Sequence, residues 1–427
     1  NKANQAKMPE EFAMSIKSKE IFTKKSIEAK QGYETYSRIQ KMIPEMVKML
    51  NGQNLTPEVV ASLKPVTQEQ AMAVAVLGQV SQDPSVKGKS PADVQKFLES
   101  QMKEALDYYT PQATQQYNLD FDPRASVVGD NYEDYTQKYY GNNHYEGPDA
   151  QHGTHVAGII AGYPQGTETQ YGVGYKTAKI MTVRTVPNGD ERDKDVANSI
   201  RYAVDNGAKI LNMSFGKPVS PGKSAVWEAF KYAQDKGVLL VKAAGNENEN
   251  IAENVYYPTN FKDVNDAKPF INNMIVVGAS TNDNEFLRAD FSNYNQKMVN
   301  VFAPGDKIYS TVPDGKYEYL QGTSMASPVV AGAASVLLAY MPNLKPEQII
   351  ESLVKTSNKS SVNAMINSNT NNRFDLISEA GGVIDLRKAA EYAFTNFYKA
   401  GAPVTTAKPK AVKKMPKKTV KKTVKRK

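Results

Sequence analysis

The chain has 427 residues, no cysteine and a formal net charge of +8 at pH 7. That length allows two or three domains and one large buried core. The absence of cysteine excludes disulfides and thiolate metal ligands. We find no run of eighteen consecutive apolar residues, so we predict a chain without a membrane span. Near the first residue we also find no signal peptide, which would show a charged region, then an apolar region, then small residues.

The positive charge is concentrated at the C-terminus. Residues 408–427 hold eleven Lys and Arg and no Asp or Glu, and the rest of the chain carries a net charge of −3. A lysine-rich segment that contains proline but no aromatic residue cannot bury a core, so we expect residues 400–427 to be disordered. We interpret this tail as a solvated segment or a weak polyanion anchor, rather than a sequence-specific reader of nucleic acid.

Residues 1–116 are predicted to form a polar region of short helices. Thr56, Thr67 and Ser90 each stand where a helix cap is expected, before proline or three residues before an acid or amide. In residues 94–109, apolar side chains recur every three or four positions, which predicts a single packing stripe along one helix. The members of the stripe are Val94, Phe97, Leu98, Met102, Ala105, Leu106 and Tyr109.

After residue 122, short apolar runs alternate with helical segments. The predicted strands are residues 126–129, 179–186, 208–215, 237–244, 274–279 and 298–303, and the predicted helices between them include residues 195–206 and 224–236. This alternation indicates an α/β fold, with a mostly parallel sheet covered by helices on both faces. We therefore divide the chain into a helical region (1–116), an α/β domain (117–399) and a basic tail (400–427).

Four short segments combine small residues with a group capable of chemistry. HGTHVAG places His152 at the start of a small-residue helix, and GTSMASP places Ser324 where the free N–H groups of a helix N-terminus favour negative charge. AAGN ends a strand with Asn246, whose amide can donate to an oxyanion. NMSFG ends another strand with Ser214 and Gly216, whose backbone groups can hold an extended peptide.

Each segment alone also has an ordinary structural explanation. His152 can be a structural histidine, Ser324 a helix cap and Asn246 a turn residue. His152 and His155 could be imagined as a metal pair. The zinc-helix pattern, however, spaces two histidines four residues apart with a glutamate beside the first, and here the spacing is three.

Together and in this order, the four segments resemble the blocks of the subtilisin-like serine proteases, peptidase family S8. The resemblance covers residues 122–390 and includes APG at residues 303–305. It implies a subtilisin-like fold and a serine endopeptidase. Ser324 would be the nucleophile, His152 the general base, and Asn246 with the Ser324 backbone N–H the oxyanion hole.

The resemblance also implies where a peptide would bind. Two strand ends are similar to the edges that hold the substrate as an added strand and wall its P1 side chain, the side chain that precedes the cleaved bond. The expected substrate-binding residues are Ser214, Phe215, Gly216, Ala243, Ala244, Gly245 and Thr323.

A triad aspartate should precede the histidine in this family, at the end of an apolar strand. No such strand with the expected small residues after it occurs before His152. Three explanations remain open. The preferred one places the aspartate upstream of Asn1 and makes the helical region an insertion, as in a Bacteroidetes-type subgroup that residues 121–158 resemble. The others make Asp130 the acid, or make the chain a catalytically inactive pseudo-protease that binds peptides.

The remaining expectations rest on the resemblance. A peptide or protein substrate, a monomer, and an extracellular or periplasmic location are expected. No cofactor is required. Structural calcium is common in the family, but we assign no site, because residues 188–193 could equally be a solvated turn.

Overall fold

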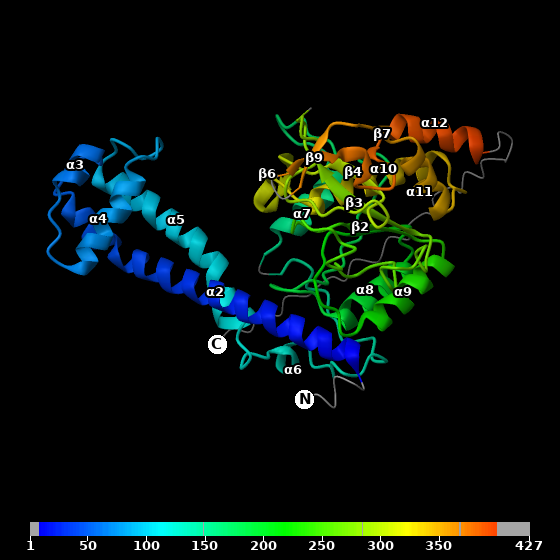
Figure 1. Cartoon of the computed structure of the whole chain (residues 1–427), viewed down its shortest axis with the longest axis horizontal. Coiled ribbons are helices and arrows are strands. Elements are labelled where there is room, and N and C mark those ends of the chain that lie inside the picture. Colours follow the sequence, from blue (N-terminus) through cyan, green and yellow to red (C-terminus); the bar gives the residue numbers. More distant parts are fainter. Residues whose placement is uncertain (1–7, 148, 284, 367–368, 399–427) are drawn as a thin grey trace, which may run out of the picture.

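The computed structural model describes residues 8–147, 149–283, 285–366 and 369–398, and it consists of a helical arm and an α/β body (Figure 1). The arm projects from the side of the body, and its far end carries α3 and α4. The predicted fold class is confirmed for the α/β body and the N-terminal helical region. The basic tail predicted at residues 400–427 lies outside the described residues.

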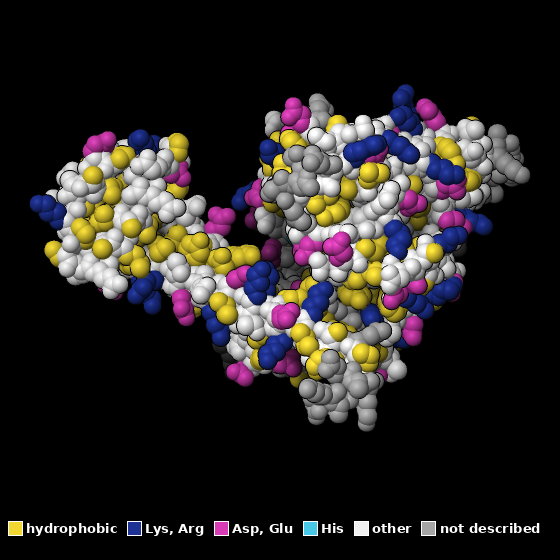
Figure 2. Space-filling model, viewed as in Figure 1, with side chains coloured by type: hydrophobic (Ala, Val, Ile, Leu, Met, Phe, Trp, Pro, Cys, Tyr) yellow, Lys and Arg dark blue, Asp and Glu magenta, His cyan; other side chains and the backbone are white. Residues whose placement is uncertain are grey.

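The arm has a hydrophobic core of its own. Its elements are α2 (Pro9–Met49), α3 (Pro57–Ser62), α4 (Gln68–Val80), α5 (Pro91–Pro111) and a π-helical turn (Gln112–Gln116). The buried core includes Met46, Leu50 and Leu77 together with Val94 and Leu98 of the predicted stripe. Space-filling representation shows further apolar side chains gathered along the outside of the arm (Figure 2).

Helix starts in the arm follow the sequence, but the length of the first helix does not. The hydroxyls of Thr56, Thr67 and Ser90 each accept a hydrogen bond from a backbone N–H of the following turn, so the three predicted caps are confirmed. The prediction of short helices is wrong for α2, which has 41 residues. This helix lies beside α5. The ring of Tyr109 packs directly on Gly32 of α2, because a Cβ atom at Gly32 would lie only 2.4 Å from the ring.

The predicted strand at residues 126–129 is instead part of a short helix, α6 (Arg124–Val127). The Oδ1 of Asp122 accepts the backbone N–H of Arg124 (3.1 Å), and proline follows Asp122, which is a strong local signal for a turn into a helix. The side chain of Val127 is 75% exposed. The strand preference of the valines is therefore overridden, because no sheet lies beside them to bury their side chains.

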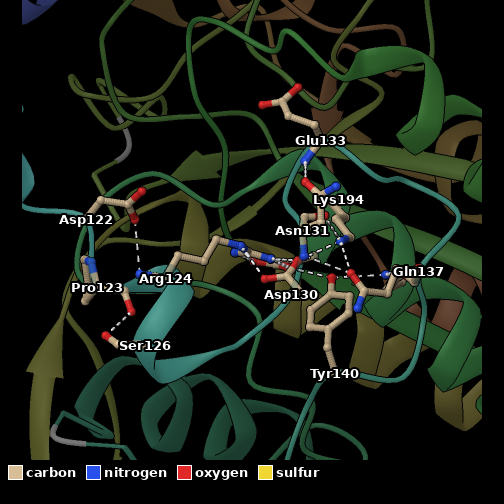
Figure 3. A network of polar contacts seen from close by, with 12 residues as sticks. Asp122, Pro123, Arg124, Ser126, Asp130, Asn131, Glu133, Gln137, Tyr140 and Lys194 are labelled. Atoms are coloured by element: carbon tan, nitrogen blue, oxygen red, sulfur yellow. Dashed lines mark hydrogen bonds and ion pairs between the residues drawn. The ribbon is translucent and has the colours of Figure 1, made fainter.

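A network of buried charges holds this segment against α8 (Asp193–Asp205) (Figure 3). Asp130 is fully buried and forms ion pairs with Arg124 (2.8 Å) and Lys194 (2.6 Å). Arg124 also pairs with Asp195 (2.9 Å), whose carboxylate accepts the Tyr140 hydroxyl (2.6 Å). Burial alone would raise the pKa of Asp130, but the hydrogen bonds and charges of Arg124 and Lys194 outweigh it and hold that pKa below its ordinary value.

The body is built on a six-stranded sheet in the order β1-β2-β3-β4-β10-β7. Its strands are β1 (Ile210–Met213), β2 (Leu239–Ala243), β3 (Met274–Ser280), β4 (Val301–Pro304), β10 (Gly382–Val383) and β7 (Asn358–Lys359). All neighbours are parallel except β10 and β7. Every residue of β2 and β3 is buried, as expected for central parallel strands with a helix layer on each face.

Two apolar cores cover the two faces of the sheet. On one face α8 and α9 (Lys223–Asp235) pack against alternate strand residues such as Leu240 and Val276. On the other face α10 (Thr323–Tyr340), α11 (Pro346–Lys355) and α12 (Leu386–Asn396) pack against Val241 and Ile275. Length and composition alone would let α10 cross a membrane, but 67% of it is buried inside the protein, as in the core helix of a soluble fold.

Smaller elements complete the body. These are α7 (Gln151–Ala161), the hairpin of β5 (Ile308–Val312) and β6 (Lys316–Leu320), the hairpin of β8 (Asn363–Ile366) and β9 (Asn369–Arg373), and the 3₁₀ turns Pro313–Gly315 and Phe374–Leu376.

The predicted strand at residues 179–186 is wrong, because the structure forms no strand there. It has no strand partner among the described residues, and Ile180 and Met181 are 45% and 42% exposed. The edge strand β1 is likewise paired only with β2 within the described part of the chain. An extended segment without a neighbour leaves its backbone N–H and C=O groups unpaired, so the apolar run alone does not make a strand.

We predict that Asp130→Asn lowers the free energy of unfolding by about 3 kcal/mol or more, because it leaves the buried Lys194 without its counter-charge and Arg124 with Asp195 alone. The matched control is Asp107→Asn, which removes an exposed ion pair with Lys103 and should cost no more than about 1 kcal/mol. Urea unfolding of both variants measures the difference. Equal small losses would contradict the role given to the buried network.

Candidate active site

Ser324 lies in the first turn of α10, beside the end of β1. The chain enters the helix through Gly322, whose φ of 148° favours glycine. The Ser324 hydroxyl donates to the carbonyl oxygen of Ser214 (3.3 Å), and the Ser214 hydroxyl donates to the carbonyl oxygen of Ser324 (2.8 Å). Ser324 is therefore tied to the residue that follows β1.

Asn246, three residues beyond β2, faces the same helix end. Its Oδ1 accepts hydrogen bonds from the backbone N–H of Thr323 (2.8 Å) and from the Thr323 hydroxyl (2.9 Å). The Thr323 Oγ1 also accepts the backbone N–H of Gly245 (3.0 Å). Because a backbone N–H can only donate, the amide oxygen must face Thr323, and the two N–H donors of Nδ2 are left for another acceptor. The structure thus brings Asn246 and Ser324 together.

His152 lies in the first turn of α7, and α7 packs beside α10. A small buried cluster joins the two helices; its members are Val156 and Ile159 of α7 and Met325 in the first turn of α10. Gly174 lies between Ile160 of α7 and Ser335 of α10. A Cβ atom on Gly174 would lie 3.2 Å from the carbonyl oxygen of Ile160 and 2.2 Å from the hydroxyl oxygen of Ser335. Gly174 thus links the end of α7 to the later part of α10. His152 lies in the first turn of α7, and Ser324 lies in the first turn of α10.

The surroundings of His152 lower the pKa of its imidazole. Although the residue is exposed, the protein around the ring lowers its pKa by burial, and the nearby His155 lowers it further, while the charge of Asp149 acts the other way. A lowered pKa keeps the ring neutral at neutral pH, which a general base requires. Within the described residues, no hydrogen bond joins His152 to Ser324, whose hydroxyl is directed to Ser214.

His155 is held by the neighbouring hairpin. Its Nε2 lies 3.1 Å from the carbonyl oxygen of Glu318 in β6, and its backbone carbonyl accepts the Ser310 hydroxyl of β5 (2.9 Å). Across the described residues, no group of three or more His, Cys, Asp or Glu side chains is placed to hold a metal ion. In the loop considered for calcium, the carboxylate of Asp193 is taken by Lys217 (2.8 Å) and the backbone N–H of Gly222 (2.8 Å).

The structure does not bring Asp130 to His152. Both oxygens of that carboxylate are engaged by Arg124 and Lys194 in the buried network (Figure 3). The carboxylate whose charge acts on His152 is Asp149, and its Oδ1 accepts the backbone N–H of Gln151 (2.9 Å) at the start of α7. This carboxylate forms a local bond two residues along the chain, and within the described part of the chain no hydrogen bond joins it to the His152 ring.

The expected substrate-binding residues form two strand ends that lie next to each other. Ser214, Phe215 and Gly216 directly follow β1, whereas Ala243, Ala244 and Gly245 close and follow β2. Parallel pairing of β1 with β2 puts these ends at the same edge of the sheet. Ala243 and Ala244 are buried, and the ring of Phe215 packs on the core under α8 and α9. Backbone rather than bulky side chains therefore faces the edge.

A family model described as the Subtilase family matches residues 70–377. The chain belongs to this family. Thermitase from Thermoactinomyces vulgaris is 41% identical over 187 residues, which are 44% of this chain and 60% of thermitase. The cell wall-associated protease of Bacillus subtilis (strain 168) is 38% identical over 225 residues, 52% of this chain and 23% of that protein. The chain thus spans less than two thirds of either relative.

Among solved structures, a cold adapted subtilisin-like serine proteinase shares 31% identity with this subtilase and has a TM-score of 0.43. The match covers 54% of this chain and 74% of the other.

Behind the two strand ends, this subtilase buries a group of charges that the sequence reasoning missed. Lys242 is fully buried, which lowers the pKa of its ammonium to about 8, and the charges of Glu191 and Glu247 oppose that shift. Burial raises the pKa of Glu191 to about 7, against the charges of Lys217 and Lys242. The single signal in the sequence is a lysine inside the otherwise apolar strand that precedes Asn246.

We predict that Glu191 makes the stability of this subtilase fall as pH rises from about 4.5 to about 7. The folded pKa is raised, so across this window the native state keeps a proton that the unfolded state has lost. The total loss should be about 3 kcal/mol. Urea unfolding across this pH range should show that Glu191→Gln removes most of the fall, whereas Glu228→Gln at an exposed position on α9 leaves it intact. Parallel curves for the two variants would contradict the prediction.

Proposed function

We propose that the protein is a serine endopeptidase in which Ser324 is the nucleophile and His152 the general base. His152 would take the Ser324 proton as the hydroxyl oxygen attacks the peptide carbonyl carbon, and would return it to the leaving amine. Water would then hydrolyse the acyl-enzyme. The packing of α7 against α10, with His152 and Ser324 each in the first turn of its helix, supports this pairing.

The observation that carries the proposal is the orientation of Asn246. Its oxygen is held by two donors of Thr323, so its Nδ2 donors face away from that residue. The first turn of α10 adds backbone N–H groups that lack partners within the helix, including that of Ser324. Hydrogen-bond donors that are fixed before the reaction stabilise an oxyanion without reorganising. This stabilisation is the largest single contribution to the rate enhancement in many enzymes that form such an oxyanion.

We further propose that peptides lie along the strand ends that follow β1 and β2. Backbone groups of Ser214 and Gly216 on one side, and of Ala244 and Gly245 on the other, would bond to the peptide as to an added strand. The small, buried side chains of Ala243 and Ala244 leave this edge open to backbone contact.

We infer that the triad carboxylate lies outside the described residues, with a position upstream of Asn1 preferred. Asp130 is engaged by Arg124 and Lys194, which argues against it as the acid. Among the described residues, one edge of β1 has no partner strand, and an additional strand could pair there because that edge has backbone groups to share. Such a strand would carry the acid to the edge where β1 ends.

The alternative is a peptide-binding pseudo-protease. Two observations favour it: the Ser324 hydroxyl donates to Ser214 rather than to His152, and the Asp149 carboxylate that acts on His152 accepts the backbone N–H of Gln151. In that case, the strand ends would bind peptides without cleaving them. The two functions differ in whether Ser324 reacts.

We predict that a fluorophosphonate probe labels the protein when the natural segment preceding Asn1 is included, and that Ser324→Ala abolishes the labelling. Asn246→Ala should lower kcat by about 10²–10³ with little change in KM, because its donors act on the transition state; this magnitude is that of an oxyanion donor in subtilisin, a member of the same family. Labelling and peptide hydrolysis measure the two effects. A folded wild type that stays unlabelled would support the pseudo-protease.

Other expectations remain proposals. We propose a monomer located outside the cytoplasm; the name of the cell wall-associated relative supports that location. The weak polyanion binding proposed for the basic tail concerns residues 408–427, which lie outside the described residues. No cofactor is needed by the proposed mechanism, and no calcium site is assigned.

A further inference from the structure

The aromatic ring of Tyr256 occupies the space between the two strand ends. A Cβ built on Gly216 would lie 2.3 Å from Cε1 of this ring, and one built on Gly245 would lie 2.9 Å from the same atom. Both distances are shorter than any carbon–carbon contact allows, so the ring lies directly against both glycines. The two glycines are those that close the edges proposed to hold a peptide.

Tyr256 is held firmly in this position. Its hydroxyl donates to the carbonyl oxygen of Gly216 (2.9 Å). The next residue, Tyr257, forms a two-way backbone bridge with Lys217, with hydrogen bonds of 2.9 Å and 2.8 Å. The segment that carries the ring is thus paired with the segment that follows β1, and the ring cannot move without breaking these bonds.

Charged groups lie around the ring. The ammonium of Lys242 lies 4.7 Å from the ring centroid, and the Glu247 carboxylate reaches to 2.6 Å from the Cβ position on Gly245. The buried Glu191 contributes further negative charge to the same region. Displacing the ring away from Lys242 would remove a cation–π contact, and displacing it toward Lys242 would press it against a buried charge; both are costly in a desolvated site. The ring therefore sets the depth of the space in front of it.

We propose that Tyr256 closes the P1 pocket between Gly216 and Gly245, so that the protein selects peptides with a small P1 residue such as glycine, alanine or serine. This inference rests on the proposed peptidase function and names the substrate class for that site. A leucine or phenylalanine side chain at P1 would need the volume that the ring fills. Packed protein gives way to added volume only at a cost, so bulky P1 residues are rejected.

The test uses peptidyl phosphonates that differ only at P1 and that phosphonylate the catalytic serine, applied to the full-length protein with its natural upstream segment. The wild type should react with the alanine probe at least about tenfold faster than with the phenylalanine probe. Tyr256→Ala should speed the reaction with the phenylalanine probe by at least about tenfold. Tyr256→Phe keeps the ring and should keep the wild-type order. Tyr202→Ala removes a half-exposed tyrosine from α8 and serves as the matched control.

The outcomes separate the inference from the proposed function. If Ser324 is labelled but the wild type reacts equally fast with phenylalanine, lysine or arginine at P1, the function stands and the role of Tyr256 is wrong. The same holds if folded Tyr256→Ala keeps the alanine preference. If no probe labels Ser324 in the wild type, the proposed function fails and the pocket assignment falls with it. If Tyr256→Ala does not fold, the relative rates at which the wild type reacts with the alanine and phenylalanine probes still decide the inference.

Discussion

The candidate site depends on a set of hydrogen bonds that joins one helix end to two strand ends. Thr323 bonds to both Asn246 and Gly245, while Ser324 and Ser214 exchange hydrogen bonds. These contacts fix the first turn of α10 against the ends of β1 and β2. The buried face of α10 then places the rest of that helix on the sheet. Chemistry at the edge of the sheet is possible because packing far from that edge holds the turn in place.

At this edge of the sheet, small side chains lie at the strand ends and charged side chains are buried beneath them. Small residues leave the backbone of the strand ends accessible, whereas Lys242 and Glu191 lie buried behind them with strongly shifted pKa values. Buried charges of this kind cost stability unless they are paired. The ammonium of Lys242 contacts the Tyr256 ring, 4.7 Å from its centroid, and so helps to fix the ring that we propose closes the pocket. The helical arm, by contrast, has a separate core, and a different ion network fastens the chain that follows it to α8.

Sequence patterns predicted the central part of the fold and were less successful at its margins. The runs that became β2 and β3 are continuous and apolar because both faces of these strands are buried, so the pattern is unambiguous. Residues 126–129 and 179–186 have similar runs, but neither has a sheet neighbour among the described residues, and pairing cannot be read from one segment alone. The motif around Asn246 and Ser324 was recognisable because its members are local. Tyr256 was not, since its place between two glycines depends on three distant segments.

The central claim is that Asn246 is oriented by Thr323 to receive an oxyanion beside Ser324. A crystal structure of the full-length protein phosphonylated at Ser324 tests it most directly. We expect one phosphonyl oxygen within about 2.7–3.1 Å of both Asn246 Nδ2 and the Ser324 backbone nitrogen, with the Thr323 hydrogen bonds to Oδ1 retained. A phosphonyl oxygen that points to solvent while the Asn246 amide turns away would contradict the account.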